Sequence, residues 1–266
     1  MKDLVISISK IFDREKIQFI VVGALARDIF FEEKRIKLDI RTKDIDFAVL
    51  VENWDEFNQV KEILMKEMGM TEESGKVYRL MHGSIPVDLL PFGQIAEPGA
   101  TVRWPGQFRA RMKVQGFQEA FDNAAEIILE KVKVRVVIPE MLVALKLSSW
   151  SLGASRSKDA MDIRLILENL KILCPDLEDD FHKDENEALF EKYNNNEIGL
   201  WISSFGSRIQ TLLGSGELSN YLKNLMSSNV TLSNLIRDMN EGNISGEELE
   251  KSLLAIVVPL KDGLIR

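Results

Sequence analysis

Two aspartates one residue apart in a β-rich run constrain this chain more than any other feature. The run is "DIDFAVLV", residues 44–51, and its carboxylates belong to Asp44 and Asp46. Because strand side chains alternate, these two share one face, while Ile45, Phe47 and Val49 supply an apolar core from the other. A buried carboxylate is costly unless it pairs, shifts its pKa or binds a metal, and two on one face raise that cost.

Two interpretations of this pair are open from the residues alone. Carboxylates at this spacing can hold one or two Mg²⁺ ions, because hard divalent cations prefer oxygen ligands. Such a site polarises a phosphoryl oxygen and activates the attacking group. Alternatively, Asp44 and Asp46 lie at a solvated strand start and pair with Lys43 or Arg41. The short motif alone favours this second interpretation, since motifs of this length recur by chance.

Two further features favour the metal site. Gly23 ends the β-rich run 17–22 and opens a predicted helix, a context in which backbone N–H groups approach a phosphate. Asp88 lies inside the apolar run 85–92, where an aspartate needs a partner or a ligand. A third carboxylate on a neighbouring strand would complete a two-metal clamp with Asp44 and Asp46.

Hydrophobic periodicity predicts a mixed α+β first half. Apolar residues at helical spacing predict a helix at the N-terminus and another after Asn53, which is placed to cap it. The segment 24–33 is predicted to be a further helix. Strands are predicted at 17–22, 44–51, 77–83 and 85–92, and a hairpin at 126–138 that turns near Glu130 and Lys131. The predicted turn between the two middle strands is at Gly83 and Ser84.

The pattern changes to helices only after Pro139, a residue suited to a helix start. The prediction is therefore an α+β domain over 1–138, with a mixed sheet flanked by helices, and a helical domain over 139–266. Helices are predicted at 140–150 and 158–170. The stretch from Pro175 to Asn196, rich in Asp, Glu and Asn, is predicted to be exposed. Helical patterns at 198–266 are interrupted at glycines, including Gly214 and Gly242.

Composition limits the classes of protein and partner. Hydrophobic residues make up 45% of the 266 residues, and no apolar run approaches the roughly 18 residues that span a bilayer. The N-terminus lacks the features of a signal peptide, so a cytoplasmic location and no membrane partner are expected. One cysteine, Cys174, excludes an internal disulfide. With a net charge of −8, any nucleic-acid contact requires a local basic patch, for which the segment 103–113 is the candidate, although a solvated loop is the commoner explanation.

The segments "VVGALARD…RTKDIDFAVLV", "IPVDLLPFG" and "PEMLVALKLSSW…RSKDAMDIRLIL" together resemble the nucleotidyltransferase superfamily, which has the polymerase-β-like fold. Within it they are most similar to the AbiEii/AbiGii-toxin-like nucleotidyltransferases, over roughly residues 15–170. By this resemblance, Asp44, Asp46 and Asp88 are the catalytic, metal-binding carboxylates, and Gly23 is the motif glycine. Ala24 departs from the pattern, because the superfamily usually has a Ser or Gly there; the backbone N–H remains.

The resemblance also implies a nucleotide-binding set. Lys146 would contact the triphosphate, and Asp159 and Asp162 would orient Lys146 or the base and ribose. The complete set is Gly23, Ala24, Thr42, Lys146, Asp159 and Asp162. The alternative for the last three is a salt-bridge network that ties the two domains together. Arg27 is expected to be a surface residue, with a phosphate contact as the alternative.

The implied function is transfer of an NMP from an NTP to an acceptor hydroxyl, with Mg²⁺ or Mn²⁺ as the cofactor and release of pyrophosphate. The nucleotide would bind in a cleft between the two domains. An RNA or tRNA end is the favoured acceptor, and an antibiotic or a protein hydroxyl are alternatives. The toxin resemblance adds an antitoxin protein as a candidate partner. The competing hypothesis is a non-catalytic nucleotide- or RNA-binding module on the same fold; Ala24 favours it and the three intact aspartates oppose it.

Overall fold

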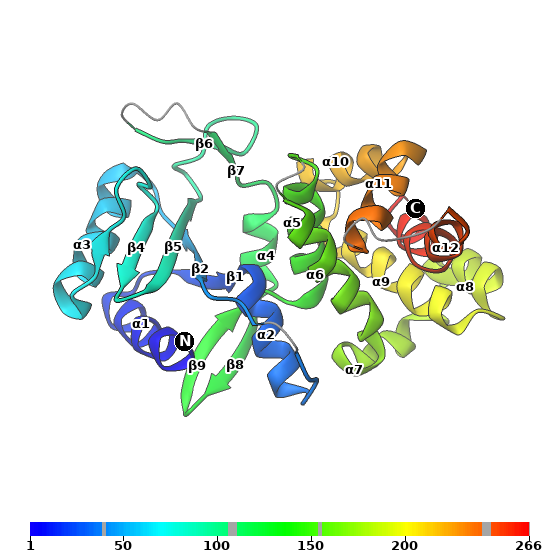
Figure 1. The fold of residues 1–266 in the computed structure, drawn as a ribbon, viewed down its shortest axis with the longest axis horizontal. Helices are drawn as coiled ribbons and strands as arrows, with labels where there is room; N and C mark the ends of the chain where they lie inside the picture. Colours follow the sequence, from blue (N-terminus) through cyan, green and yellow to red (C-terminus); the bar gives the residue numbers. More distant parts are fainter. Residues whose placement is uncertain (39–40, 106–110, 154–155, 241–245, 266) are drawn as a thin grey trace. The chain divides into compact units, whose positions relative to one another are not determined.

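The computed structural model describes residues 1–38, 41–105, 111–153, 156–240 and 246–265. The chain divides into two compact units, Met1–Ile138 and Pro139–Arg266. Figure 1 shows that strands occur in the first unit, whereas the described part of the second is built from helices. The predicted α+β class with a helical second part is confirmed.

The first unit carries nine strands and four helices within its described residues. In chain order they are α1 (Lys2–Glu15), β1 (Phe19–Val22), α2 (Gly23–Glu33), β2 (Ile45–Leu50), α3 (Trp54–Met68), β3 (Thr71–Glu72), β4 (Arg79–His82), β5 (Ile85–Phe92), β6 (Thr101–Arg103), β7 (Arg111–Lys113), α4 (Phe117–Asp122), β8 (Ala125–Leu129) and β9 (Val132–Val136). Asn53 caps α3 as expected, because its side chain accepts a hydrogen bond from the backbone N–H of Glu56.

Seven of these strands form one mixed sheet in the order β3-β4-β5-β2-β1-β9-β8. Strands β1 and β2 pair antiparallel, whereas β2 pairs parallel with β5 and β1 pairs parallel with β9. All the predicted strands of the sheet are present. The last hairpin turns at Glu130 and Lys131, which both have positive φ angles, and this is the geometry of a tight two-residue turn.

An aromatic cluster identifies the apolar face of the central strands. Phe12 of α1 contacts Phe19 and Phe47, with ring centroids 5.0 and 5.6 Å away, and all three side chains are buried. Helix α1 therefore covers the face of the sheet on which Phe47 lies. Because strand side chains alternate, the neighbouring Asp46 projects from the opposite face of β2.

The basic segment 103–113 differs from the solvated loop that its composition suggested. Its ends form the antiparallel pair β6 and β7, which makes a separate two-stranded sheet. Trp104 is buried against Trp54, Phe57 and Tyr78, so this aromatic side chain belongs to the core and is not free to stack on a base. Residues 106–110 lie outside the described part of the chain.

The helical unit contains nine α-helices and three short helices of other types within its described residues. They are α5 (Pro139–Trp150), α6 (Ser157–Glu168), α7 (Leu170–Leu173), η2 (Pro175–Asp180), η3 (Asp184–Asn186), α8 (Glu187–Tyr193), α9 (Glu197–Leu213), α10 (Glu217–Met226), α11 (Asn229–Met239), α12 (Gly246–Ser252), η4 (Leu253–Val257) and α13 (Val258–Leu264). Two predicted helices correspond to α5 and α6, and Gly214 follows the end of α9. The predicted break at Gly242 lies outside the described residues.

Most residues of the acidic stretch 175–196 are exposed, as expected, but the stretch also has secondary structure and contributes apolar side chains to the core. Leu177, Phe181 and Leu189 are buried, and the stretch folds into η2, η3 and α8. Arg208 of α9 anchors the stretch to the helical unit. Its guanidinium donates to Asp180 at 2.6 Å and to Asp176 at 2.7 Å, so a cation from a later helix neutralises the acidic segment and holds it on the unit.

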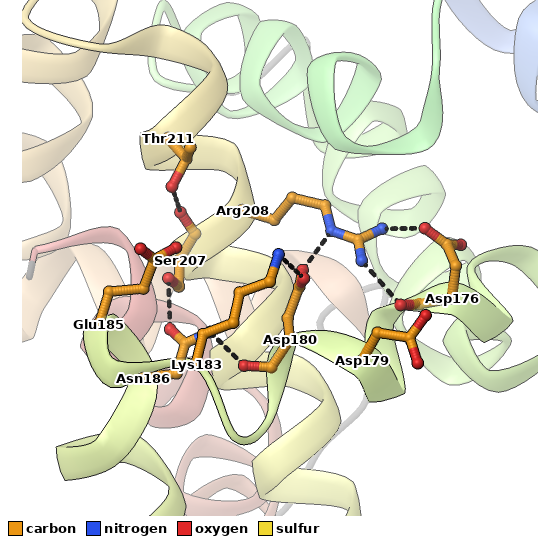
Figure 2. A pocket seen from close by; sticks show the side chains of 9 residues that line it. All are labelled: Asp176, Asp179, Asp180, Lys183, Glu185, Asn186, Ser207, Arg208 and Thr211. Carbon is orange, nitrogen blue, oxygen red and sulfur yellow. Dashed lines mark hydrogen bonds and ion pairs between the residues drawn. The ribbon is translucent and has the colours of Figure 1, made fainter.

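Figure 2 shows how these groups surround a polar pocket of about 330 Å³. Besides Arg208, the wall contains Lys183, whose ammonium lies 2.5 Å from Asp180, and Ser207, which donates to Asn186 at 2.7 Å. The principal cations of the pocket already have carboxylate partners from the same unit. We therefore assign this pocket a structural role in docking the acidic segment onto α9.

Helices α9 and α13 pack backbone against backbone at two glycines. A Cβ atom on Gly263 would lie 2.1 Å from the carbonyl oxygen of Ser203 and 2.7 Å from the backbone nitrogen of Ser207. A Cβ atom on Gly206 would lie 2.7 Å from the carbonyl oxygen of Leu260. Main-chain atoms on both sides leave no flexible side chain that could move aside, so both positions require glycine.

Among the described residues, no helix combines the length and the apolar character that a membrane span requires.

Substituting Gly263→Ala is expected to lower the free energy of unfolding by about 1–3 kcal/mol, because overpacking forces α13 away from α9. Gly246→Ala is the matched control, since Gly246 begins α12 and nothing among the described residues lies within 4 Å of where its Cβ atom would be. Urea unfolding of both variants decides the matter. Equal stability of the two variants would contradict the close helix contact.

Candidate active site

Strand register places the predicted carboxylates side by side. Asp46 of β2 is the Cα partner of Asp88 on the parallel strand β5, and paired residues on neighbouring strands project from the same face. Asp44 precedes Asp46 by two residues, immediately before β2, and lies on that face too. The row continues on both sides, because Val22 pairs with Asp46 and Arg79 pairs with Asp88.

Gly23 lies directly against this row. It follows β1, begins α2 and has a φ angle of 69°. A Cβ atom at this position would lie 2.0 Å from Oδ2 of Asp46, so only glycine allows the backbone to approach the carboxylate this closely. Ala24 follows in the first turn of α2 and is half-buried. The glycine and the aspartate that the sequence linked by motif are thus in contact.

Asp88 has a cationic partner that sequence reasoning missed. The guanidinium of Arg79 holds both carboxylate oxygens, with Nε donating to Oδ1 at 2.5 Å and the second contact at 2.7 Å. Burial raises the pKa of the Asp88 carboxyl above its usual value, and the charge of Asp44 adds to this rise, while Arg79 opposes it. The repulsion from Asp44 shows that these two carboxylates interact electrostatically.

Asp44 is held by its own neighbour. The hydroxyl of Thr42 donates to Oδ1 of Asp44 at 2.5 Å, and the backbone N–H of Thr42 donates to Asp28 at 3.0 Å. Arg27, expected on the surface, is 5% exposed and donates to the same Asp28 carboxylate at 2.5 and 2.9 Å. The surface prediction for Arg27 is wrong because Asp28 supplies a buried counter-ion.

Of the two cations in the alternative interpretation, Lys43 and Arg41, the second has a partner on α2. Arg41 forms an ion pair of 3.4 Å with Glu32 of α2, and both side chains are largely exposed. Exposed pairs of this kind contribute little to stability.

The donor set of this face fits a hard divalent cation. Asp44 and Asp46 offer carboxylate oxygens, the ligand type that Mg²⁺ prefers. The third carboxylate is bound to Arg79. Among the described residues, no group of three His, Cys, Asp or Glu side chains could hold a metal ion together. Asp44 and Asp46 are therefore the residues that fit the metal in this arrangement.

The second predicted cluster lies within the helical unit. The ammonium of Lys146 on α5 is buried and lies 3.0 Å from Asp159 and 2.5 Å from Asp162, both on α6. Burial opposes the charged form, but Asp162 and Asp159 outweigh it and raise the pKa of Lys146. These ion pairs join two helices of the helical unit.

One oxygen of this cluster has an unmet hydrogen-bonding capacity. Oδ2 of Asp159 is buried, and no hydrogen bond reaches it from the described residues; Arg156 lies 3.8 Å away. A buried acceptor without a donor is rare in native structures and needs an explanation, such as a ligand or a water.

Gly23→Ala is expected to destabilise the protein more than Gly69→Ala. Both glycines have φ angles near 60–70° and end or begin a helix, so both variants have similar backbone strain. Only at Gly23 would the new methyl group strike Asp46, whereas nothing described lies within 4 Å at Gly69. Thermal melting of the two variants measures the difference, and identical losses would argue against the close contact of Gly23 with Asp46.

Comparison with known proteins identifies a family for this chain. The model of the family described as nucleotidyl transferase AbiEii toxin, type IV TA system, matches residues 41–231, which is well over half of the chain. The matched range includes Asp44, Asp46 and Asp88, and also the Lys146 cluster. A search of curated proteins finds no match.

Solved structures of nucleotidyltransferases are also similar. The crystal structure of ANT(2'')-Ia in complex with adenylyl-2''-tobramycin is 16% identical, with a TM-score of 0.43, and the match covers 78% of this chain and 97% of that one. An antigenic nucleotidyltransferase-like protein from Paracoccidioides brasiliensis is 16% identical with a TM-score of 0.43, over 88% of this chain and 90% of that one. On the strength of the family match, the chain belongs to the AbiEii nucleotidyl transferase toxin family, and it is a nucleotidyltransferase.

Proposed function

We propose that this nucleotidyltransferase depends on Mg²⁺ or Mn²⁺ and moves an NMP from an NTP to a hydroxyl at an RNA or tRNA end. The observation that carries the proposal is the row of carboxylates on one face of the sheet, in which Asp46 and Asp88 are cross-strand neighbours and Gly23 contacts Asp46. Positioning and charge neutralisation are the main sources of rate in phosphoryl transfer, and such a row serves both.

Candidate site residues from the first unit have defined roles in this proposal. Asp44 and Asp46 would hold the metal, which supplies charge neutralisation at the phosphates and a lowered pKa at the acceptor hydroxyl. Gly23 and Ala24 would present backbone N–H groups to the phosphates at the start of α2, where the helix dipole favours an anion. Asp88 would bind the ion that lowers the pKa of the acceptor hydroxyl, once Arg79 has released its carboxylate.

The Lys146 cluster supports a nucleotide-binding role in the helical unit. Lys146 stays protonated because its pKa is raised, so it carries the positive charge that a triphosphate requires. The open Oδ2 of Asp159 is an acceptor suited to a ribose hydroxyl or a base amino group. Asp162, at 2.5 Å from the Lys146 ammonium, would orient that side chain.

The choice of RNA as acceptor rests on the toxin family and on one local feature. Arg103 and Arg111 face each other across β6 and β7, and both are exposed, which provides basic groups on a protein with a net charge of −8. An antibiotic or a protein hydroxyl is the alternative acceptor, and an antitoxin protein is the candidate partner.

Incubation with each α-labelled NTP, Mg²⁺ or Mn²⁺, and total RNA is expected to place label in RNA, together with release of pyrophosphate. Asp46→Asn should reduce the label by at least about a thousandfold, because it removes a metal ligand while keeping the shape of the side chain. Glu62→Gln, which neutralises an exposed carboxylate on α3, is the control and should transfer normally. Label in protein alone would identify a protein hydroxyl as the acceptor in place of RNA. Label in neither would contradict the proposed reaction.

Melting curves test the metal separately from catalysis. Mn²⁺ should raise the melting temperature of the parent, because a ligand that binds only the folded state stabilises it. Asp46→Asn should melt at the parent temperature or higher without metal, since it relieves repulsion among carboxylates, and its rise with Mn²⁺ should shrink. A destabilised variant beside a parent that ignores Mn²⁺ would mean that the aspartates are structural.

A further inference from the structure

Asp28 is a buried carboxylate with no role in the reaction proposed above. It lies in α2, is 6% exposed, and uses both oxygens. Oδ1 accepts from Nε and from the second terminal nitrogen of Arg27, and Oδ2 accepts from the backbone N–H of Thr42. Ionised groups are rarely buried unless their bonds perform a structural or functional task. The Thr42 bond is the one that leaves the helix.

This bond fixes the segment that carries Asp44. Thr42 lies 14 residues beyond Asp28, just before β2, and its hydroxyl donates to Asp44 at 2.5 Å. A continuous chain of hydrogen bonds therefore runs from Arg27 through Asp28 and Thr42 to a carboxylate of the proposed metal site. Charge-assisted bonds of this kind are stronger than neutral ones and have defined geometry.

A cavity borders Thr42 on one side. Asp28 and Thr42 both line a cavity of about 500 Å³ whose walls come from α1, α2 and β8. Atoms beside a void lack the contacts that fix side chains in a close-packed interior. The neighbouring ion pair between Arg41 and Glu32 is exposed and weak. The hydrogen bond to Asp28 is a part-buried contact that joins this position to α2.

We propose that Asp28 is a positioning residue for nucleotidyl transfer: it anchors Thr42, and Thr42 orients the Asp44 carboxylate toward the metal. The inference rests on the proposed metal site but concerns residues outside it. Groups that orient metal ligands commonly change metal affinity 10–100-fold when they are removed. The hydrogen bonds from Arg27 orient the Asp28 carboxylate.

Binding of Mn²⁺, followed by the EPR signal of the free ion, tests the proposal without turnover. Thr42→Val keeps the backbone N–H but loses the hydroxyl, and about tenfold weaker binding is expected; Thr42→Ser should restore it. Asp28→Asn should weaken binding by a similar factor. The double variant should bind no more weakly than the weaker single one, because both changes break the same chain. Glu32→Gln, on the same helix, should bind like the parent.

Amide hydrogen exchange at Thr42, measured without metal, separates the two proposals. Asp28→Asn should speed this exchange severalfold, and Glu32→Gln should not. Unchanged exchange, or losses that add in the double variant, would overturn the role of Asp28. If the unsubstituted protein does not bind Mn²⁺, the proposed metal site is wrong. Faster amide exchange at Thr42 in Asp28→Asn would still establish that Asp28 anchors Thr42. If Asp28→Asn fails to fold, the Thr42→Val and Thr42→Ser pair decides: equal affinity in the two would refute the proposal.

Discussion

The parallel pairing of β2 with β5 is the constraint on which the site depends. It makes Asp46 and Asp88 neighbours, although 42 positions separate them in the chain. A one-residue slip in this register would turn one of the two carboxylates to the face that α1 covers. Phe47 and its β5 partner Leu89 are both buried, so a slip would also take one of these apolar side chains out of the core. Core packing on one face thus sets the chemistry on the other.

Charge compensation is the second theme of the structure. Asp88 has Arg79, Asp28 has Arg27, and the carboxylates of α6 have Lys146. Each partner comes from a neighbouring strand, the same helix or an adjacent helix, so short local distances serve to stabilise buried ions. Removing one member of such a pair is far more damaging than replacing both, because the survivor remains buried without a partner.

Much of the fold could be predicted from the sequence, because its strands and helices have clear periodicity. The core strands, the capped helix after Asn53 and the helical second part all follow local rules. Three short strands, β3, β6 and β7, escaped prediction because two or three residues give no periodic signal. How the acidic stretch is held on the helical unit could not be predicted for a different reason: its cation, Arg208, lies in a later helix, and composition alone cannot reveal so distant a partner.

The candidate site, too, could be predicted only in part. Asp44, Asp46, Asp88 and Gly23 were found from a motif, and the structure brings them together, whereas their catalytic roles remain predictions. Arg79 was missed, although a signal existed. The predicted turn at Gly83 and Ser84 fixes the hairpin register, which places position 79 opposite Asp88. Arg27 was misplaced because its counter-ion is the next residue, a pairing that spacing rules for helices do not anticipate.

The bond between Arg79 and Asp88 has a consequence for how the protein responds to its environment. Any cation that binds Asp88 competes with a guanidinium that is already in place. Its apparent affinity is its intrinsic affinity multiplied by the fraction of molecules in which Arg79 has moved away. A negatively charged substrate that attracts Arg79 would raise that fraction. Metal and nucleotide would then each improve the binding of the other, so that the two would bind cooperatively through Arg79.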